Sequence, residues 1–344
     1  MLTVYSPRHV LRDPRTELAG GELVAPLEAP VRATLIRDAI AAAGLGPIRP
    51  PDAFDAAPVL RVHDPTFVAF LETAWARWRD AGMAGEAIPT VLPARRMRQR
   101  PVRNIEGLLG YYALSTETSI DAGTWEAALV AKDVALTAAA AIASGAATAF
   151  ALCRPPGHHA AIDLYGGYCF LNNAAIATQW LRDRGIGRVA ILDVDFHHGN
   201  GTQDVFDARD DVLFVSLHGD PEDAFPHFSG FADEIGRGTG EGFTANYPLP
   251  PGTDWHEWSA ALDDALARIR RFGPDVLVVS LGVDTFVDDP IGFFRFATDD
   301  FERLGERLGR LGYPTLYVME GGYAVDAIGD NVVGVLRGDL QVRA

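Results

Sequence analysis

Short apolar runs alternate with longer segments of mixed apolar and polar residues along the chain. The runs contain few polar positions, which is typical of strands buried on both faces of a parallel sheet. Helical patterns fill the intervals between them. Predicted strands cover residues 3–5, 59–62, 148–152, 189–192, 212–217, 276–281 and 315–319, and predicted helices cover 29–43, 66–81, 124–143, 172–184, 255–272 and 299–311. The pattern therefore predicts an α/β fold built on a wound sheet.

The length allows one large domain or two smaller ones. The 344 residues contain no internal repeat and no low-complexity linker, and 48% of them are hydrophobic. We expect a single domain over residues 1–344 with a sizeable core. Residues 134–153 carry no charged side chain, but this stretch is mostly alanine and Ser144-Gly145 interrupts it. We therefore expect a buried helix and strand there, and no membrane segment.

Charge and cysteine content bear on partners and location. The chain has 46 acidic and 30 basic residues, a formal charge of −16, which disfavours a nucleic acid and favours cationic ligands. Two cysteines, Cys153 and Cys169, are few for a secreted chain of this length, and residues 1–10 lack an apolar run. We expect reduced cysteines and a cytoplasmic location.

One segment departs from the acidic composition. Residues 88–103 form a basic, proline-bearing stretch with arginines at 95, 96, 98, 100 and 103. The segment is either a solvated surface loop or a contact with an acidic partner surface such as a second subunit.

Ligand-type side chains follow the predicted strand at 189–192. Asp193, Asp195 and His197 are spaced by two residues, so in extended backbone they share one face at the carboxyl end of the strand. Two carboxylates beside an imidazole in a dry site are costly without a cation. Asp284 follows the strand at 276–281, and Asp195, His197 and Asp284 would leave an open position on a divalent metal, as hydrolytic sites do.

Acid–base groups follow two other strands. His158 and His159 come after a Pro-Pro-Gly turn that can direct both rings into one pocket, where Asp193 and Asn200 are candidate hydrogen-bond partners. Tyr323 follows two glycines, and its phenol could donate to a developing oxyanion. Each group alone is more often structural, so the prediction rests on their clustering after strand ends.

Five motifs together resemble the arginase and histone deacetylase superfamily: Arg-Pro-Pro-Gly-His-His at 154–159, Gly-Gly-Tyr-Cys-Phe-Leu-Asn-Asn at 166–173, Asp-Val-Asp-Phe-His-His-Gly-Asn-Gly-Thr at 193–202, Ser-Leu-Gly-Val-Asp at 280–284 and Glu-Gly-Gly-Tyr at 320–323. Segments 16–23, 70–75 and 219–228 are similar to those of bacterial acetylpolyamine amidohydrolases. The resemblance implies one three-layer αβα domain around a mostly parallel sheet of about eight strands.

The resemblance also implies residue roles. Asp195, His197 and Asp284 would bind Zn²⁺, with Fe²⁺ or another divalent ion as the alternative because two of the three ligands are oxygen. His159 would take a proton from water and return it to the leaving amine, and His158 would tune the site. Tyr323 and the metal would hold the oxyanion.

Asn200 departs from the family pattern. Many histone deacetylases have an acid at this position, whereas here His159 would lean on a neutral amide and His158 on Asp193. The two histidines should therefore differ in pKa, and which one is the general acid stays open.

The superfamily also carries structural K⁺. One implied site involves Asp193, Asp195, His197, Ser216 and Leu217, and the other Phe206, Arg209, Val212 and Tyr247. The residues implied to bind substrate are Tyr168, Phe225 and Gly167 along an aromatic tunnel, and Glu17, Glu106 and Glu117 at its acidic mouth.

These residues favour a cationic acetylated amine as the substrate. Acetylputrescine, acetylcadaverine, acetylspermidine and acetylspermine fit this description, and an acetyl-lysine peptide is the rival substrate because it is cationic too. A catalytically silent acetyl-ligand-binding metalloprotein is the other alternative. An insertion at about 82–105 in similar amidohydrolases pairs two subunits and narrows the mouth, so a homodimer would exclude peptides. Only one ligand set is present, which disfavours binuclear arginase chemistry.

Overall fold

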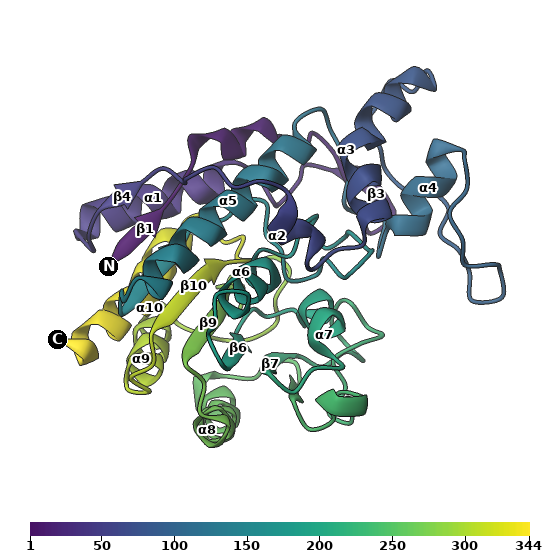
Figure 1. Ribbon diagram of the computed structural model, residues 1–344. Helices are drawn as coiled ribbons and strands as arrows, with labels where there is room; N and C mark the ends of the chain where they lie inside the picture. Colours follow the sequence, from purple (N-terminus) through teal and green to yellow (C-terminus); the bar gives the residue numbers. More distant parts are fainter.

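Eight strands form one central sheet in which every neighbouring pair is parallel (Figure 1). The computed structural model describes residues 1–344. The strands follow the order β4-β1-β5-β10-β9-β6-β7-β8 across the sheet. Their bounds are Leu2–Val4 (β1), Ile48–Arg49 (β4), Thr148–Ala151 (β5), Val189–Asp193 (β6), Val212–Gly219 (β7), Thr244–Leu249 (β8), Val276–Leu281 (β9) and Thr315–Met319 (β10). A separate antiparallel pair, Glu17–Ala19 (β2) and Glu22–Val24 (β3), lies outside this sheet.

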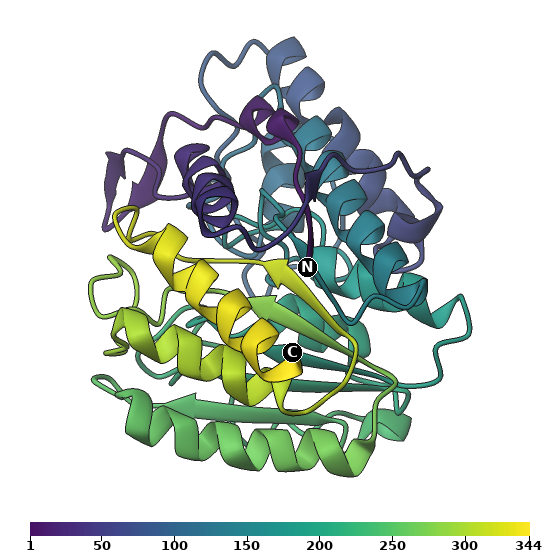
Figure 2. The same cartoon turned by 90° about the vertical axis from the view of Figure 1, so that its left-hand side faces the viewer.

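Helices cover both faces of the sheet and make three layers. Figure 2 shows α9 and α10 side by side over one face, and α1 and α8 complete that layer. The opposite face packs against α5 and α6, and α3 and α4 extend the same hydrophobic core beyond them. The helices are Val31–Ala43 (α1), Ala57–Leu60 (α2), Pro65–Asp80 (α3), Ile105–Tyr112 (α4), Thr124–Ala143 (α5), Asn173–Arg182 (α6), Asn200–Phe206 (α7), Trp255–Phe272 (α8), Thr298–Gly309 (α9) and Ile328–Arg343 (α10), with 3-10 turns at Pro7–Leu11 and Gly238–Gly240.

Alternation within the buried strands explains the layers. In β6, Val189 and Ile191 enter the core under α5 and α6, whereas Ala190 and Leu192 enter the core under α8 and α9. Successive side chains of a strand point to opposite faces, so a strand that is apolar at every position can only lie between two layers. The predicted α/β class, the three layers and the eight-stranded sheet are therefore confirmed.

The strand predicted at residues 59–62 is wrong. Residues Ala57–Leu60 form the short helix α2, in which Pro58 occupies an early position that needs no backbone donor. A short apolar run fits a buried helix as well as a strand, and periodicity alone does not separate them. None of the helices is both long and apolar enough to cross a bilayer.

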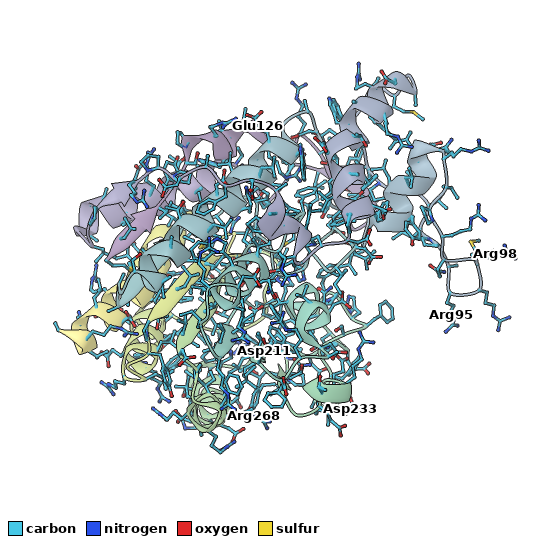
Figure 3. The ribbon with its side chains drawn as sticks, in the orientation of Figure 1. Arg95, Arg98, Glu126, Asp211, Asp233 and Arg268 are labelled. Atoms are coloured by element: carbon cyan, nitrogen blue, oxygen red, sulfur yellow. The ribbon has the colours of Figure 1, made fainter.

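The arginine-bearing segment projects from the body of the protein. Residues 82–104 contain no helix or strand apart from a single bridge between Ala87 and Ile120. Figure 3 shows Arg95 and Arg98 on this loop, pointing away from the sheet and its helices. The loop leads into α4, which begins after its cap Asn104.

Candidate active site

The candidate residues meet at the carboxyl ends of four adjacent strands. β5, β10, β9 and β6 are neighbours in the sheet, and the segments that follow them carry His158 and His159, Tyr323, Asp284, and Asp195 with His197. Parallel strands end at one edge of a sheet, so residues far apart in sequence meet there. The predicted clustering of these four strand-end segments is thus present in the fold.

Asp195, His197 and Asp284 form a buried group suited to a metal ion. One ligand atom of each lies within 4.8 Å of the others. His197 Nδ1 is 3.1 Å from Asp284 Oδ2 and 3.3 Å from Asp195 Oδ1. The remaining oxygens are held by the backbone, because Gly321 N–H donates to Asp195 Oδ2 at 2.7 Å and Phe196 N–H donates to Asp284 Oδ1 at 2.8 Å. The other oxygen of each carboxylate lies beside His197 Nδ1, and Asp195 Oδ1 also accepts the His197 backbone N–H at 2.9 Å. This donor set fits a divalent ion.

Gly321 has to be glycine at this place. A Cβ on this residue would lie 2.4 Å from Asp284 Oδ2 and 2.7 Å from Asp195 Oδ2. The backbone can approach both carboxylates only without a side chain. The first glycine of the Gly-Gly-Tyr motif thus serves the metal group by allowing a close approach of the backbone.

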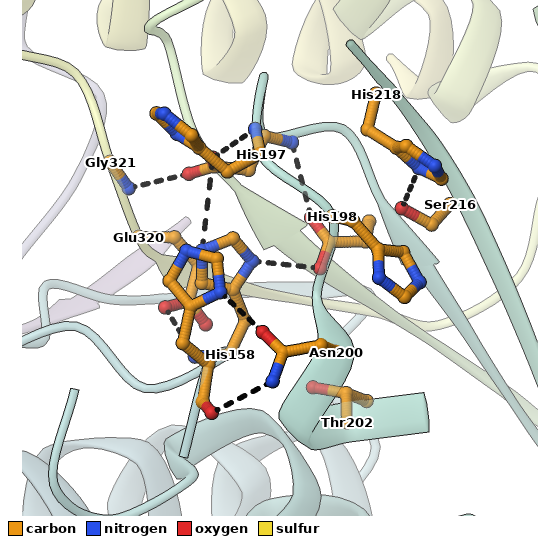
Figure 4. A network of polar contacts seen from close by, with 12 residues as sticks. His158, His197, His198, Asn200, Thr202, Ser216, His218, Glu320 and Gly321 are labelled. Atoms are coloured by element: carbon orange, nitrogen blue, oxygen red, sulfur yellow. Dashed lines mark hydrogen bonds and ion pairs between the residues drawn. The ribbon is translucent and has the colours of Figure 1, made fainter. Parts of the chain in front are cut away.

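His158 and His159 share one pocket but have different partners. Their ring centroids are 4.1 Å apart, which agrees with the predicted effect of the Pro-Pro-Gly turn. His158 Nδ1 lies 3.0 Å from Asp193 Oδ2, and His159 Nδ1 lies 2.7 Å from Asn200 Oδ1. Figure 4 shows this network around Asn200, with the Gly321 N–H directed at a carboxylate of the metal group. Asp193 and Asn200, the candidate hydrogen-bond partners predicted from the sequence, are thus the partners of the two rings in the fold.

These partners separate the pKa values of the two histidines. Burial by itself lowers the pKa of His158, but the charges of Asp195 and Asp193 outweigh it and raise that pKa well above the ordinary value. Burial, together with the charges of His158 and His197, lowers the pKa of His159 well below it. His159 is therefore the neutral imidazole that can accept a proton, and the expected difference in pKa is present.

Tyr323 faces the cavity as a neutral phenol. Burial raises its pKa well above the ordinary value, against the opposing charge of Arg32, whose guanidinium carbon lies 4.6 Å from the ring centroid. The Tyr323 backbone N–H donates to Asp289 Oδ2 at 2.7 Å. A protonated phenol on an anchored backbone is suited to donate a hydrogen bond to substrate.

A cavity of about 290 Å³ leads from the surface to this group. Tyr168 and Phe225 line it as predicted, and the Phe225 ring stands edge-on to His159 at 5.0 Å. Gly167 lies against His159, because a Cβ there would be 2.3 Å from the ring carbon Cδ2. The fifteen lining residues are Glu17, Leu18, Ala19, Glu117, His159, Gly167, Tyr168, Phe196, His197, Asp223, Ala224, Phe225, Ile291, Phe293 and Tyr323.

The three predicted acids of the mouth are placed differently. Glu17 and Glu117 line the cavity, whereas Glu106 is exposed near the start of α4 and is absent from the lining. Glu17 accepts a hydrogen bond from the Tyr168 hydroxyl at 2.6 Å, and burial raises its pKa. Glu117 accepts the Gly167 N–H at 2.8 Å. Both glutamates therefore also hold the cavity wall.

Sequence reasoning missed two carboxylates that hold catalytic segments. Glu320 Oε2 accepts the backbone N–H groups of Gly157 and His158 at 2.6 and 3.1 Å, and burial raises the pKa of Glu320 to about 7. Asp289 anchors Tyr323. The sequence does show an acid directly before Gly-Gly-Tyr. Only the fold shows that this acid binds the backbone of the segment that follows β5.

Two buried arginines, Arg32 and Arg154, also hold the segments that carry the candidate catalytic residues. Arg32 donates to the backbone carbonyls of Gly322 and Glu320 at 2.6 and 2.8 Å, and also to Glu28. Arg154, the first residue of the Arg-Pro-Pro-Gly-His-His motif, donates to the same Glu28 at 2.8 Å. The two arginines and one glutamate thereby connect the N-terminal segment to two catalytic segments.

The residues implied to hold K⁺ lie on or next to β6, β7 and β8. Asp193 pairs with Ser216 in the register of β6 and β7, and Leu217 pairs with Tyr247 in that of β7 and β8. The Ser216 hydroxyl lies 2.8 Å from His218 Nδ1. Phe206 ends α7, Arg209 lies in the following turn, and Val212 begins β7. Two adjoining groups of oxygen-bearing residues are thus present, and their ions stay predictions.

Comparison with known proteins settles the family. A family model described as the histone deacetylase domain matches residues 26–338. The chain belongs to the histone deacetylase family. It is 54% identical over 338 residues to an acetylpolyamine amidohydrolase from Mycoplana ramosa, covering 98% of this chain and 99% of that one. It is also 54% identical over 340 residues to acetylpolyamine amidohydrolase 1 of Pseudomonas aeruginosa, covering 98% of each chain.

A solved structure agrees with this assignment. A crystal structure of an acetylpolyamine aminohydrolase from Burkholderia pseudomallei matches with a TM-score of 0.95 at 42% identity, and each chain is covered completely. The resemblance seen in the sequence is therefore confirmed, and so is the amidohydrolase class within this deacetylase family. The buried Asp195, His197 and Asp284 group is the metal site typical of the family.

Proposed function

We propose that the protein hydrolyses the acetamide of N-acetylated polyamines to acetate and a free amine. The observation that carries the proposal is one cavity whose lining includes His197 of the metal group at its inner end and the carboxylates of Glu17 and Glu117. An acetamide at the inner end and ammonium groups toward the mouth would satisfy both sets. The names of the relatives support this substrate class, which includes acetylputrescine, acetylcadaverine, acetylspermidine and acetylspermine.

We propose Zn²⁺ as the resident metal, held by Asp195, His197 and Asp284, with Fe²⁺ or another divalent ion as the alternative. When bound, such an ion polarises the substrate carbonyl and makes a water nucleophilic near neutral pH. The position of Asp284 Oδ2 and Asp195 Oδ1 beside His197 Nδ1, at 3.1 and 3.3 Å, supports this assignment.

The chain's own residues move the protons. His159, neutral and oriented by Asn200, takes the proton of the attacking water at Nε2 and returns it to the leaving amine. His158 stays positively charged beside Asp193 and stabilises negative charge in the site. The Tyr323 phenol donates to the acetamide oxygen as it becomes an oxyanion.

The cavity wall suits an aliphatic substrate. Tyr168 and Phe225 bury methylene groups without a polar cost, and Gly167 lets the wall approach His159. Glu17 and Glu117 contribute negative charge, and Glu106 is kept as a more distant acid on α4. A peptide backbone needs a wider entrance than a polyamine does.

Structural K⁺ and a homodimer are parts of the same proposal. One K⁺ would be bound by Asp193, Asp195, His197, Ser216 and Leu217, and the other by Phe206, Arg209, Val212 and Tyr247. The projecting loop with Arg95 and Arg98 supports pairing of two subunits, which would narrow the mouth. Free, buried Cys153 and Cys169 support a reducing, cytoplasmic setting.

The rivals are a protein deacetylase and a silent acetyl-ligand binder. The placement of His158, His159 and Tyr323 around the metal group argues against a silent binder, because binding alone needs no proton carrier. A panel of acetylated polyamines and acetyl-lysine peptides, assayed with defined metals, separates the enzymes. We expect kcat/KM to be far higher for the polyamines, and a preference for the peptide would overturn the proposal.

A further inference from the structure

The cavity has a third lining carboxylate, Asp223, which lies on the loop after β7. It is exposed, and its carboxylate makes neither a hydrogen bond nor an ion pair within the chain. Its position is nevertheless defined, because the backbone N–H groups of Asp223 and Ala224 both donate to Asp220 O at 2.8 Å. A free charge thus stands at a fixed place in the lining of the cavity.

The other two carboxylates are already engaged by the protein. Glu17 accepts the Tyr168 hydroxyl on one oxygen and the Leu27 N–H on the other, at 2.6 and 3.1 Å. Burial also raises the pKa of Glu17, which weakens its hold on a negative charge. A new cation would have to compete with these bonds.

Glu117 is committed through a single oxygen. Its Oε1 accepts hydrogen bonds from Ser115 Oγ at 2.6 Å, from Thr118 Oγ1 at 2.9 Å and from Gly167 N–H at 2.8 Å. These bonds hold Oε1 at the wall beside His159, so only Oε2 can meet a ligand without releasing that wall. Asp223 can bind a cation without breaking a hydrogen bond within the protein.

We propose that Asp223 is the specificity-determining residue that pairs with the free ammonium group of the acetylated amine. Ala224 and Phe225, the next two residues, line the same cavity, and Phe225 contacts His159 edge-on. An aliphatic chain that runs from the metal group along Phe225 therefore leads toward Asp223. This inference rests on the proposed function and names the group that reads the charge of the substrate.

The experiment compares two substrates of one shape. N-acetylputrescine ends in an ammonium group, and N-pentylacetamide carries a methyl group in its place. D223N should lower kcat/KM for N-acetylputrescine about tenfold, mostly through KM, because an ion pair in a partly desolvated cavity is lost. The same variant should leave kcat/KM for N-pentylacetamide unchanged. The penalty should shrink as ionic strength rises.

Glu222→Gln is the matched control, since Glu222 is the exposed neighbouring acid and does not line the cavity. It should change neither substrate's kinetics. An unchanged ratio of the two kcat/KM values in D223N overturns the inference, and so does an equal loss for both substrates, which would indicate a structural role. If the wild type hydrolyses acetyl-lysine peptides and not N-acetylputrescine, the proposed function fails and this inference fails with it.

Discussion

His159 places its Nδ1 2.7 Å from the amide oxygen of Asn200, whereas the neighbouring His158 contacts a carboxylate. Burial and the charges of His158 and His197 lower the pKa of His159 more than Asn200 and Asp195 raise it, and the neutral amide of Asn200 brings no charge of its own. Asn200→Asp should therefore raise the pKa of His159. Because the general base must be neutral, the acid limb of the kcat/KM profile should move to higher pH.

The measurement is a pH profile of kcat/KM from pH 5 to 9. Asp204→Asn is the matched control, because Asp204 lies on the same helix α7 and accepts only the Ile162 N–H. Its acid limb should stay in place. An acid limb in N200D that coincides with that of the wild type would show that His159 is not the titrating base.

Tyr323→Phe removes only the phenol oxygen. We expect kcat to fall by about 10²-fold or more, because one donor to the oxyanion is lost, while metal content and thermal stability stay near those of the wild type. Tyr313→Phe is the control, since Tyr313 lies on the turn before β10 and outside the cavity. Turnover of Y323F close to the wild-type rate would remove the proposed role of the phenol.

Chelation should abolish activity and lower the melting temperature. The metal binds only the folded chain, so at a free concentration of a hundred times Kd it stabilises the fold by about 2.7 kcal/mol. Removal also leaves two buried carboxylates, Asp195 and Asp284, beside each other. Scanning calorimetry with and without chelator, followed by zinc readdition, measures the effect. In the Asp284→Asn variant, chelation should change the melting temperature little. A change as large as that of the wild type would place the stabilising metal elsewhere.

His63 should make stability depend on pH. The ring is buried, with Nδ1 2.8 Å from Ala161 O and Nε2 accepting the Asn172 N–H at 3.0 Å. Burial lowers the pKa of His63 from 6.5 to about 4. Below pH 6.5 the unfolded chain binds a proton that the folded chain does not, so stability falls until about pH 4, by about 3 kcal/mol for this group.

Urea unfolding of His63→Asn at several pH values tests this sign. The variant should be less stable than the wild type at pH 8, because its two hydrogen bonds are weakened, but the gap should narrow between pH 6.5 and 4. A gap that stays constant over this range would mean that His63 titrates normally in the folded protein.

The strands that carry the site could be predicted from sequence, and the elements at the margins could not. β6 and β9 are apolar at almost every position, so they are stable only where both faces of the sheet are covered. β4 has two residues, and β8 mixes Asn246, Tyr247 and Pro248, so neither shows a clear apolar run. Pro248 is tolerated because β8 is an edge strand.

Helix α10 shows how packing overrides local preference. Its glycines lower helix propensity and hide the pattern, yet a Cβ on Gly338 would lie 2.1 Å from the backbone oxygen of Glu302 in α9. The close approach of α9 and α10 requires the glycine. A contact between two helices cannot be inferred from either segment alone.

The chemistry of the site was more predictable than its support. Asp195, His197 and Asp284 can be recognised because they follow predicted strands. Asn200 can be recognised because it lies in the 193–202 motif with Asp195 and His197. Glu320, Asp289 and Arg32 act on the backbone of segments up to 290 residues away. Hydrogen bonds between residues so far apart along the chain produce no recognisable motif in the sequence.

The position of β10 has a consequence for biosynthesis. This strand is among the last elements along the chain, yet it lies between β5 and β9 in the middle of the sheet. Until residue 319 has left the ribosome, β5 and β9 each expose an unpaired inner edge that invites pairing with another nascent chain. Closure of the catalytic centre therefore requires β10, and a chain truncated before β10 should aggregate rather than accumulate as a shortened enzyme.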